Sequence, residues 1–244
     1  MLEVDRVRKA FGGLLANKDV SLRVPAGGIF GLIGPNGSGK TTLFNSIVGH
    51  HPIDAGSIRF EGREISRLRV PQIARLGLLR TFQQTRIYGG MTCVENMAIS
   101  VPTSELGWRS MWQRTPEADL RKASDLLEFV GLFPKRHLRA GDLSFGQQKL
   151  LELAMALMSA PRMLLLDEPT AGINPTLING LLERLRKINR QFGITLLVIE
   201  HNMRVIMELA EYVYCLAHGE LLAEGKPEQI QQDPRVLEAY LGAR

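Results

Sequence analysis

A glycine-rich run near the N-terminus has the residue types and the spacing of a phosphate-binding loop. It consists of Gly34, Pro35, Asn36, Gly37, Ser38, Gly39, Lys40, Thr41 and Thr42. Glycines let the backbone curl until successive N–H groups converge on one anion, and the start of a helix adds partial positive charge. The Lys40 ammonium adds a full charge, and the Thr41 hydroxyl can ligate Mg²⁺. The run therefore predicts that the chain binds a nucleoside triphosphate.

The segments on either side of this run predict the strand and the helix that such a loop requires. Residues 29–33 are apolar and predict a buried strand that ends at the loop. Residues 40–48 predict the helix that carries the loop, and Gly49 closes that helix. Residues 2–24 alternate loosely, and residues 57–60 continue the pattern, which predicts antiparallel strands beside the loop.

Two adjacent carboxylates form a second candidate site. Asp167 and Glu168 directly follow residues 163–166, a continuous apolar run that is typical of a strand buried on both faces. An open parallel sheet presents its ligands at such strand ends. There Asp167 can hold the hydration shell of Mg²⁺, and Glu168 can orient a water that attacks the γ-phosphate. With Lys40 stabilising the charge on the leaving phosphates, the pair predicts triphosphate hydrolysis.

The middle of the chain is predicted to be helical. Residues 92–95 form a capping box, and residues 115–117 place a cap and a first-turn proline before a second helix. Between them, residues 101–113 show no clear period. A second capping box, made by Ser144 and Gln147, predicts another helix whose first N–H groups are exposed. This stretch looks like a helical subdomain inserted into the nucleotide-binding core.

The last third of the chain alternates strands with helices. Residues 163–166 and 194–199 predict strands separated by a helix that starts at Asn174, an arrangement that indicates a parallel sheet. Residues 212–223 predict a hairpin that turns near residue 218, followed by a helical tail at 234–241. The predicted fold is α/β, a P-loop NTPase core with a mainly parallel sheet, an antiparallel β subdomain and an inserted α-helical subdomain.

Composition narrows the class of protein. The 244 residues carry a formal net charge of +5, but basic and acidic residues are interleaved, which favours a solvated surface over a nucleic-acid groove. Cys93 and Cys215 lie far apart in apolar surroundings, and we interpret them as reduced core thiols and not as a metal or disulfide site. No apolar stretch approaches the roughly 20 residues that cross a bilayer, and no secretion signal is evident. We therefore expect the protein to stay in the cytosol.

Taken together, these motifs resemble those of ABC-transporter ATPase subunits over nearly the whole chain. The segment 143–147 is similar to the signature motif of that family, with Phe145 where glycine is most common. The resemblance implies one ABC ATPase domain over residues 1–244, in which 1–91 and 161–244 form the core and 92–160 the helical subdomain. It also implies that ATP held by the loop of one subunit is covered by signature residues of a second subunit, namely Ser144, Phe145, Gly146 and Gln147.

Further roles follow from the resemblance alone. It makes Phe11 the aromatic residue that stacks on adenine, and Gln83 the residue that senses Mg²⁺ and the membrane partner. His201 corresponds to the histidine that hydrogen-bonds the γ-phosphate and supports Glu168. Asn174 lies in the segment that corresponds to the D-loop, where aspartate is more common. The implied Mg²⁺ ligands are therefore Thr41, Gln83 and Asp167.

Four short segments resemble those of a narrower group, the ATPases of branched-chain amino acid importers. These segments are residues 80–83, 171–175, 200–203 and 238–242. We expect an ATPase, converting ATP and water to ADP and phosphate, that powers uptake of a polar solute. The expected partners are integral membrane permeases and a second ABC ATPase subunit, which is either identical to this chain or different from it. The complex is expected at the cytoplasmic face of the inner membrane, and we expect no nucleic-acid partner. Open alternatives are a urea or amide importer, a lipid or lipopolysaccharide exporter, and a soluble ABC ATPase that acts on ribosomes or DNA.

Overall fold

The computed structural model describes residues 1–81, 87–101 and 116–241. The chain divides into two compact units. The core unit contains residues 1–80, 162–169 and 185–244, and the helical unit contains residues 81–161 and 170–184. Residues 81, 87–91 and 170–184, which the sequence analysis assigned to the core, thus group with the helical unit.

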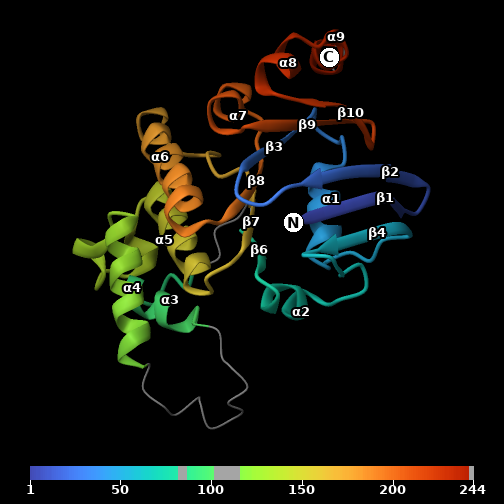
Figure 1. Cartoon of the computed structure of the whole chain (residues 1–244). Helices are drawn as coiled ribbons and strands as arrows, with labels where there is room; N and C mark the ends of the chain where they lie inside the picture. Colours follow the sequence, from blue (N-terminus) through green and yellow to red (C-terminus); the bar gives the residue numbers. More distant parts are fainter. Residues whose placement is uncertain (82–86, 102–115, 242–244) are drawn as a thin grey trace. The chain divides into compact units, whose positions relative to one another are not determined.

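A six-stranded sheet forms the centre of the core unit (Figure 1). Its order is β10 (Glu220–Gly225), β9 (Tyr212–Ala217), β3 (Ile29–Ile33), β8 (Thr195–Ile199), β7 (Met163–Asp167) and β6 (Leu78–Arg80). All neighbouring pairs are parallel except the β9–β10 hairpin. Every residue of β3, β7 and β8 is buried, which is why these strands are continuous apolar runs in the sequence. The predicted parallel sheet is confirmed.

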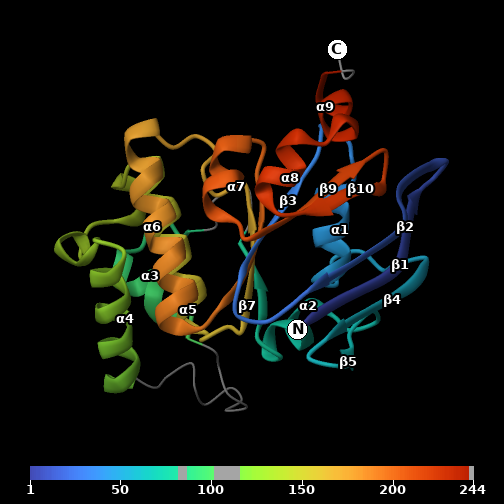
Figure 2. The ribbon, with the colours of Figure 1, turned by 45° about the horizontal axis from the view of Figure 1, so that its top comes forward.

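An antiparallel sheet in the same unit confirms the predicted β subdomain. Its order is β2 (Leu14–Val24), β1 (Leu2–Phe11), β4 (Ala55–Phe60) and β5 (Arg63–Glu64). Helix α1 (Lys40–Ile47) lies between the two sheets (Figure 2), and its Leu43 and Phe44 are fully buried in one hydrophobic cluster with residues of both. This packing fixes the start of α1, and with it the glycine-rich loop, against the end of β3.

Four short helices complete the core unit, together with the C-terminal part of α6 (Pro175–Phe192). They are α2 (Val70–Arg75), α7 (Met203–Leu209), α8 (Pro227–Gln232) and α9 (Pro234–Leu241). The tail helix α9 was predicted, whereas α2, α7 and α8 were not. Each of the three has fewer than eight residues, which is too few turns for an apolar period to be recognised.

The helical unit contains the three helices predicted for the middle of the chain and two short 3₁₀ turns. They are α3 (Cys93–Ile99), α4 (Glu117–Phe129), η2 (Phe133–Lys135), η3 (Ala140–Asp142) and α5 (Phe145–Met158). The capping boxes at Thr92 and Ser144 are both formed. Pro116 is the N-cap of α4 and not a first-turn residue, and the predicted irregular segment lies almost entirely at 102–115, outside the described residues.

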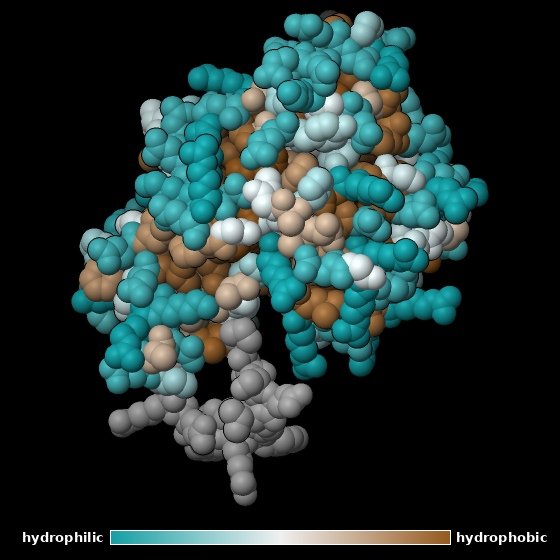
Figure 3. All heavy atoms as spheres, in the orientation of Figure 1, coloured by the Kyte–Doolittle hydropathy of each residue, from teal (hydrophilic) through white to brown (hydrophobic). Residues whose placement is uncertain are grey.

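Most of the surface visible in Figure 3 is hydrophilic, in keeping with the interleaved charges of the sequence. None of the helices in the described ranges is long and apolar enough to cross a membrane. Both cysteines are free and buried, as predicted.

Candidate functional site

The glycine-rich loop joins β3 to α1. At two of its positions, only glycine can adopt the backbone conformation without a steric clash. Gly34 has φ +146°, and a Cβ there would lie 2.0 Å from the Leu216 carbonyl oxygen. Gly39, the N-cap of α1, has φ +98°, and a Cβ there would lie 2.3 Å from the Ala16 carbonyl oxygen. Both glycines are therefore required by close packing as well as by conformation.

Lys40 begins α1 and directs its ammonium into the loop. Its Nζ donates hydrogen bonds to the carbonyl oxygens of Gly34 (2.8 Å) and Pro35 (2.9 Å) and to Ser38 Oγ (3.3 Å). Burial lowers the pKa of Lys40, and the nearby negative charges of Glu168 and, more weakly, Asp167 oppose that shift. The carboxylate pair and the loop are thus electrostatically coupled.

Asp167 ends β7 and is almost completely buried. Its Oδ2 accepts a hydrogen bond from Arg80 Nη2 at 2.5 Å, and Arg80 Nη1 donates to Asn45 Oδ1 at 2.5 Å. Asp167 Oδ1 is buried without a hydrogen-bond partner among the described residues. A carboxylate oxygen with free lone pairs suits the water shell of Mg²⁺, which keeps several waters beside phosphate ligands.

Within residues 1–81, 87–101 and 116–241, no group of three or more His, Cys, Asp or Glu side chains could hold an ion. The exposed Thr41 on the first turn of α1 and the buried Oδ1 of Asp167 are oxygen donors, the ligand type that Mg²⁺ takes beside phosphate oxygens and water. The donor set therefore fits magnesium bound together with a nucleotide.

The side chains of Glu168 and His201 lie within hydrogen-bond distance, as the resemblance implied, although no local sequence pattern encodes the contact. The distance between Glu168 Oε1 and His201 Nε2 is 2.5 Å, and the side chains are 15% and 42% exposed. Glu168 has φ +50°, a left-handed conformation that is costly for a residue with a Cβ, and its N–H donates to the Ile199 carbonyl at 2.9 Å. The strained backbone holds a largely buried carboxylate beside an accessible imidazole, an arrangement that can orient a water molecule.

Phe11 ends β1 and is 45% exposed. Its ring meets His51 edge to face at a centroid distance of 5.3 Å, and Lys9 Nζ lies 5.3 Å from its centroid. An exposed aromatic face of this kind is available to stack on a planar base. Gln83, the other residue assigned by resemblance in this part of the chain, lies outside the described residues.

The signature segment begins α5 in the helical unit. Ser144 is exposed, and its Oγ accepts from Gln147 N–H (3.4 Å) while Gln147 Oε1 accepts from Ser144 N–H (3.1 Å). The Phe145 ring lies against Gly172, where an added Cβ would come within 2.7 Å of it. This contact joins the signature segment to the D-loop segment of the same chain. The unusual aromatic residue at position 145 is the one local signal that points to this contact.

Asn174, in the same D-loop segment, has a local role. Its Oδ1 accepts hydrogen bonds from the Thr176 N–H (3.1 Å) and from Thr176 Oγ1 (2.9 Å), which supports the start of α6.

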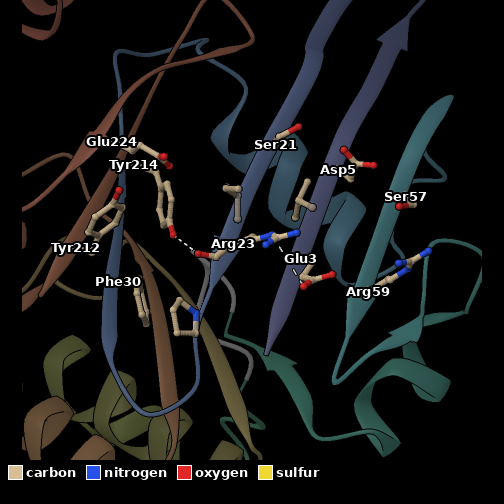
Figure 4. Close-up of a pocket in the computed structure, with 13 residues that line it drawn as sticks. Glu3, Asp5, Ser21, Arg23, Phe30, Ser57, Arg59, Tyr212, Tyr214 and Glu224 are labelled. Carbon is tan, nitrogen blue, oxygen red and sulfur yellow. Dashed lines mark hydrogen bonds and ion pairs between the residues drawn. The ribbon is translucent and has the colours of Figure 1, made fainter.

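Among the cavities of the core unit, we compare two that involve described residues, and the larger of these two is not at the phosphate loop. It has a volume of about 540 Å³ and opens between the outer face of β2, β1 and β4 and the strands β9 and β10 (Figure 4). Tyr212, Tyr214 and Glu224 line one side, and charged side chains such as Arg23 and Arg59 line the other. The second cavity, about 460 Å³, is lined by the loop residues 35–38 and by residues of α9. The residues that could bind phosphate and orient a water lie at the phosphate loop, and Lys40, Glu168 and His201 do not line the larger cavity.

A phosphate loop between a buried strand and a helix, with an Asp-Glu pair at the end of a strand in the same parallel sheet, defines a P-loop nucleoside triphosphatase. The chain belongs to the ABC transporter family of ATP-binding cassettes, whose model matches residues 17–171. Its C-terminal residues 220–244 match a second model, described as a branched-chain amino acid ATP-binding cassette transporter. The protein is thus an ABC ATPase of the transport type.

Curated relatives cover the whole chain. It is 39% identical to the high-affinity branched-chain amino acid transport ATP-binding protein BraF of Pseudomonas aeruginosa, over 99% of this chain and 98% of the relative. It is 36% identical to LivG of Escherichia coli, a protein of the same description, with the same coverage.

Solved structures share the fold. MJ1267, an ATP-binding cassette of an ABC transporter, superposes with a TM-score of 0.89 at 34% identity, covering 98% of both chains. A dimeric bacterial ABC transporter cassette, MJ0796, superposes with a TM-score of 0.78 at 25% identity, covering 93% of this chain and 99% of the other. These similarities confirm the predicted family and fold.

Proposed function

We propose that this ABC ATPase powers the uptake of branched-chain amino acids. The full-length likeness to branched-chain amino acid transport ATP-binding proteins supports the solute class, as does the separate match of residues 220–244. The alternatives are a urea or amide importer and a lipid exporter, and the transport assay below separates the first of these from the proposal.

The single observation that carries the ATPase assignment is the Glu168–His201 pair beside a formed phosphate loop. In the proposed reaction, Lys40 and the loop N–H groups bind the β- and γ-phosphates, and Phe11 stacks on adenine. Glu168, held by His201, orients the water that attacks the γ-phosphate, and His201 also donates to that phosphate. Thr41, Asp167 and Gln83 would hold Mg²⁺, which when bound would supply positive charge beside the phosphate oxygens.

The proposed unit of action is a pair of ATPase subunits. The exposed start of α5 in a second subunit, with Ser144 and Gly146, covers the γ-phosphate held by the first subunit. ATP then favours the closed pair because it adds contacts that the open pair lacks, and hydrolysis removes them. The existence of dimeric cassettes among the structural relatives supports this arrangement. We place the pair on membrane permeases, at the cytoplasmic face of the membrane.

The catalytic assignment is tested with Glu168→Gln, which keeps the size of the side chain but removes its charge. We expect ATP binding to persist and the hydrolysis rate to fall at least about 100-fold, the usual scale for loss of a positioned acid–base group. Glu228→Gln, at an exposed site on α8, is the matched control and should retain the parental rate. Parental turnover by Glu168→Gln would show that the catalytic carboxylate lies elsewhere.

The solute is tested in cells that depend on this subunit and its own permeases. Accumulation of labelled leucine should require the parental subunit and should fail with Glu168→Gln. Labelled urea and an amide serve as the competing substrates. If leucine uptake is independent of the subunit while urea or amide uptake depends on it, the amino acid proposal is wrong although the ATPase assignment stands.

A further inference from the structure

The C-terminal helix α9 reaches back to the first residue of the phosphate loop. Tyr240, in the last turn of α9, accepts a hydrogen bond at its hydroxyl from the Gly34 N–H, with a donor–acceptor distance of 2.8 Å. The two residues are 206 positions apart in the chain. Burial raises the pKa of Tyr240 to about 12, so the hydroxyl stays protonated at physiological pH.

Gly34 lies where the chain leaves the sheet. Pairing between β3 and β9 ends at Ile33 opposite Cys215, so the next amide is not part of the strand pairing. Gly34 is itself buried, and a buried N–H without a partner is costly. The Tyr240 hydroxyl supplies that partner.

The same glycine is also held from its other side. Its carbonyl oxygen accepts from Lys40 Nζ at 2.8 Å, the shortest of the three contacts that hold the ammonium. Tyr240 therefore fixes the peptide group before Gly34, and Lys40 is bound to the peptide group after it. A shift of Gly34 would move a partner of the lysine that binds phosphate.

A second element of the C-terminal segment holds the far side of the loop. At the tip of the β9–β10 hairpin, Gly219 N–H donates to the Ser38 carbonyl at 3.2 Å, and its own carbonyl accepts from Lys18 N–H at 2.7 Å. The cavity of about 460 Å³ lined by both loop and α9 residues shows that α9 lies beside the loop without filling the space around Asn36 and Gly37.

We propose that Tyr240 is a positioning residue for the phosphate loop, whose hydroxyl fixes Gly34 and thereby the geometry in which Lys40 and the loop amides meet the nucleotide phosphates. The inference rests on the proposed ATP site but assigns to the C-terminal helix a part in nucleotide affinity. Tyr240 does not touch the nucleotide and acts through Gly34.

The test compares Tyr240→Phe with Tyr212→Phe. The first substitution removes only the hydroxyl that binds Gly34, while Tyr212 lies on β9 and its hydroxyl has no hydrogen-bond partner among the described residues. In the full-length protein, we expect Tyr240→Phe to weaken ATP and ADP binding roughly three- to tenfold and to raise KM to the same degree, as the loss of one hydrogen bond allows. The kcat at saturating ATP should stay within about twofold, because the groups at the reacting phosphate are unchanged.

Amide hydrogen exchange provides the second readout. The Gly34 amide should be protected in the parental protein and in Tyr212→Phe and should exchange faster in Tyr240→Phe. If both variants bind nucleotide equally well, or if the Gly34 amide keeps its protection in Tyr240→Phe, the positioning role is wrong. A parental protein that fails to bind ATP at all would overturn the proposed function instead.

Discussion

We expect Arg80→Met to destabilise the core unit by about 3–5 kcal/mol, because it leaves the Asp167 carboxylate buried without its guanidinium partner. The two side chains are 5% and 2% exposed, so water cannot replace the lost partner. Arg80 also donates to Asn45 at 2.5 Å and lies 5.7 Å from the centroid of the Phe44 ring, contacts that methionine replaces only in part. For a chain of this size, such a loss lowers the melting temperature by roughly 6–20 °C.

The matched control is Arg162→Met. Arg162 pairs with Glu61 at 2.9 Å, but these side chains are 63% and 37% exposed, so the loss should be only about 0–1 kcal/mol. Urea unfolding of both variants, followed by circular dichroism, measures the difference. The double variant Arg80→Met/Asp167→Leu should recover part of the stability, because it removes the unpaired buried charge. Equal losses in Arg80→Met and Arg162→Met, or no recovery in the double variant, would refute the reasoning.

Three further outcomes follow from the described structure. Gly172→Ala should lower stability by about 1–2 kcal/mol, since Gly172 has φ +73°. The added Cβ would also lie 2.7 Å from the Phe145 ring, so a second substitution, Phe145→Gly, should recover only the share of the loss that this clash causes. Urea unfolding of the single and double variants separates the clash from the backbone strain. An unchanged unfolding midpoint in Gly172→Ala would contradict the expectation. The buried Cys215 has a pKa raised from 9.0 to about 11 by burial, so its neutral thiol favours folding below about pH 9 and this contribution is lost as pH rises towards 11. Iodoacetamide at pH 8 should modify neither Cys93 nor Cys215 until denaturant is added, as mass spectrometry would show; rapid labelling of the native protein would contradict their burial.

Much of the fold was predictable because its signals are local. The capping boxes at Thr92 and Ser144 each involve four consecutive residues, and the buried strands are continuous apolar runs. The phosphate loop is encoded in the same way, by glycines and a lysine within nine positions. Helices α2, α7 and α8 were not predicted because six or seven residues are too few to establish an apolar period.

The sequence by itself determined the class of chemistry: a phosphate loop, an Asp-Glu pair after a buried strand, and a signature segment that begins a helix. Only the tertiary structure decided that Arg80 supports Asp167 and that Tyr240 supports Gly34, and it placed His201, which the resemblance had already assigned, against Glu168. The physical reason is that each of these contacts joins side chains or amides brought together by strand order and burial, across as many as 206 positions of chain. A motif records which groups are present within a few residues, whereas partners from distant segments are selected by packing.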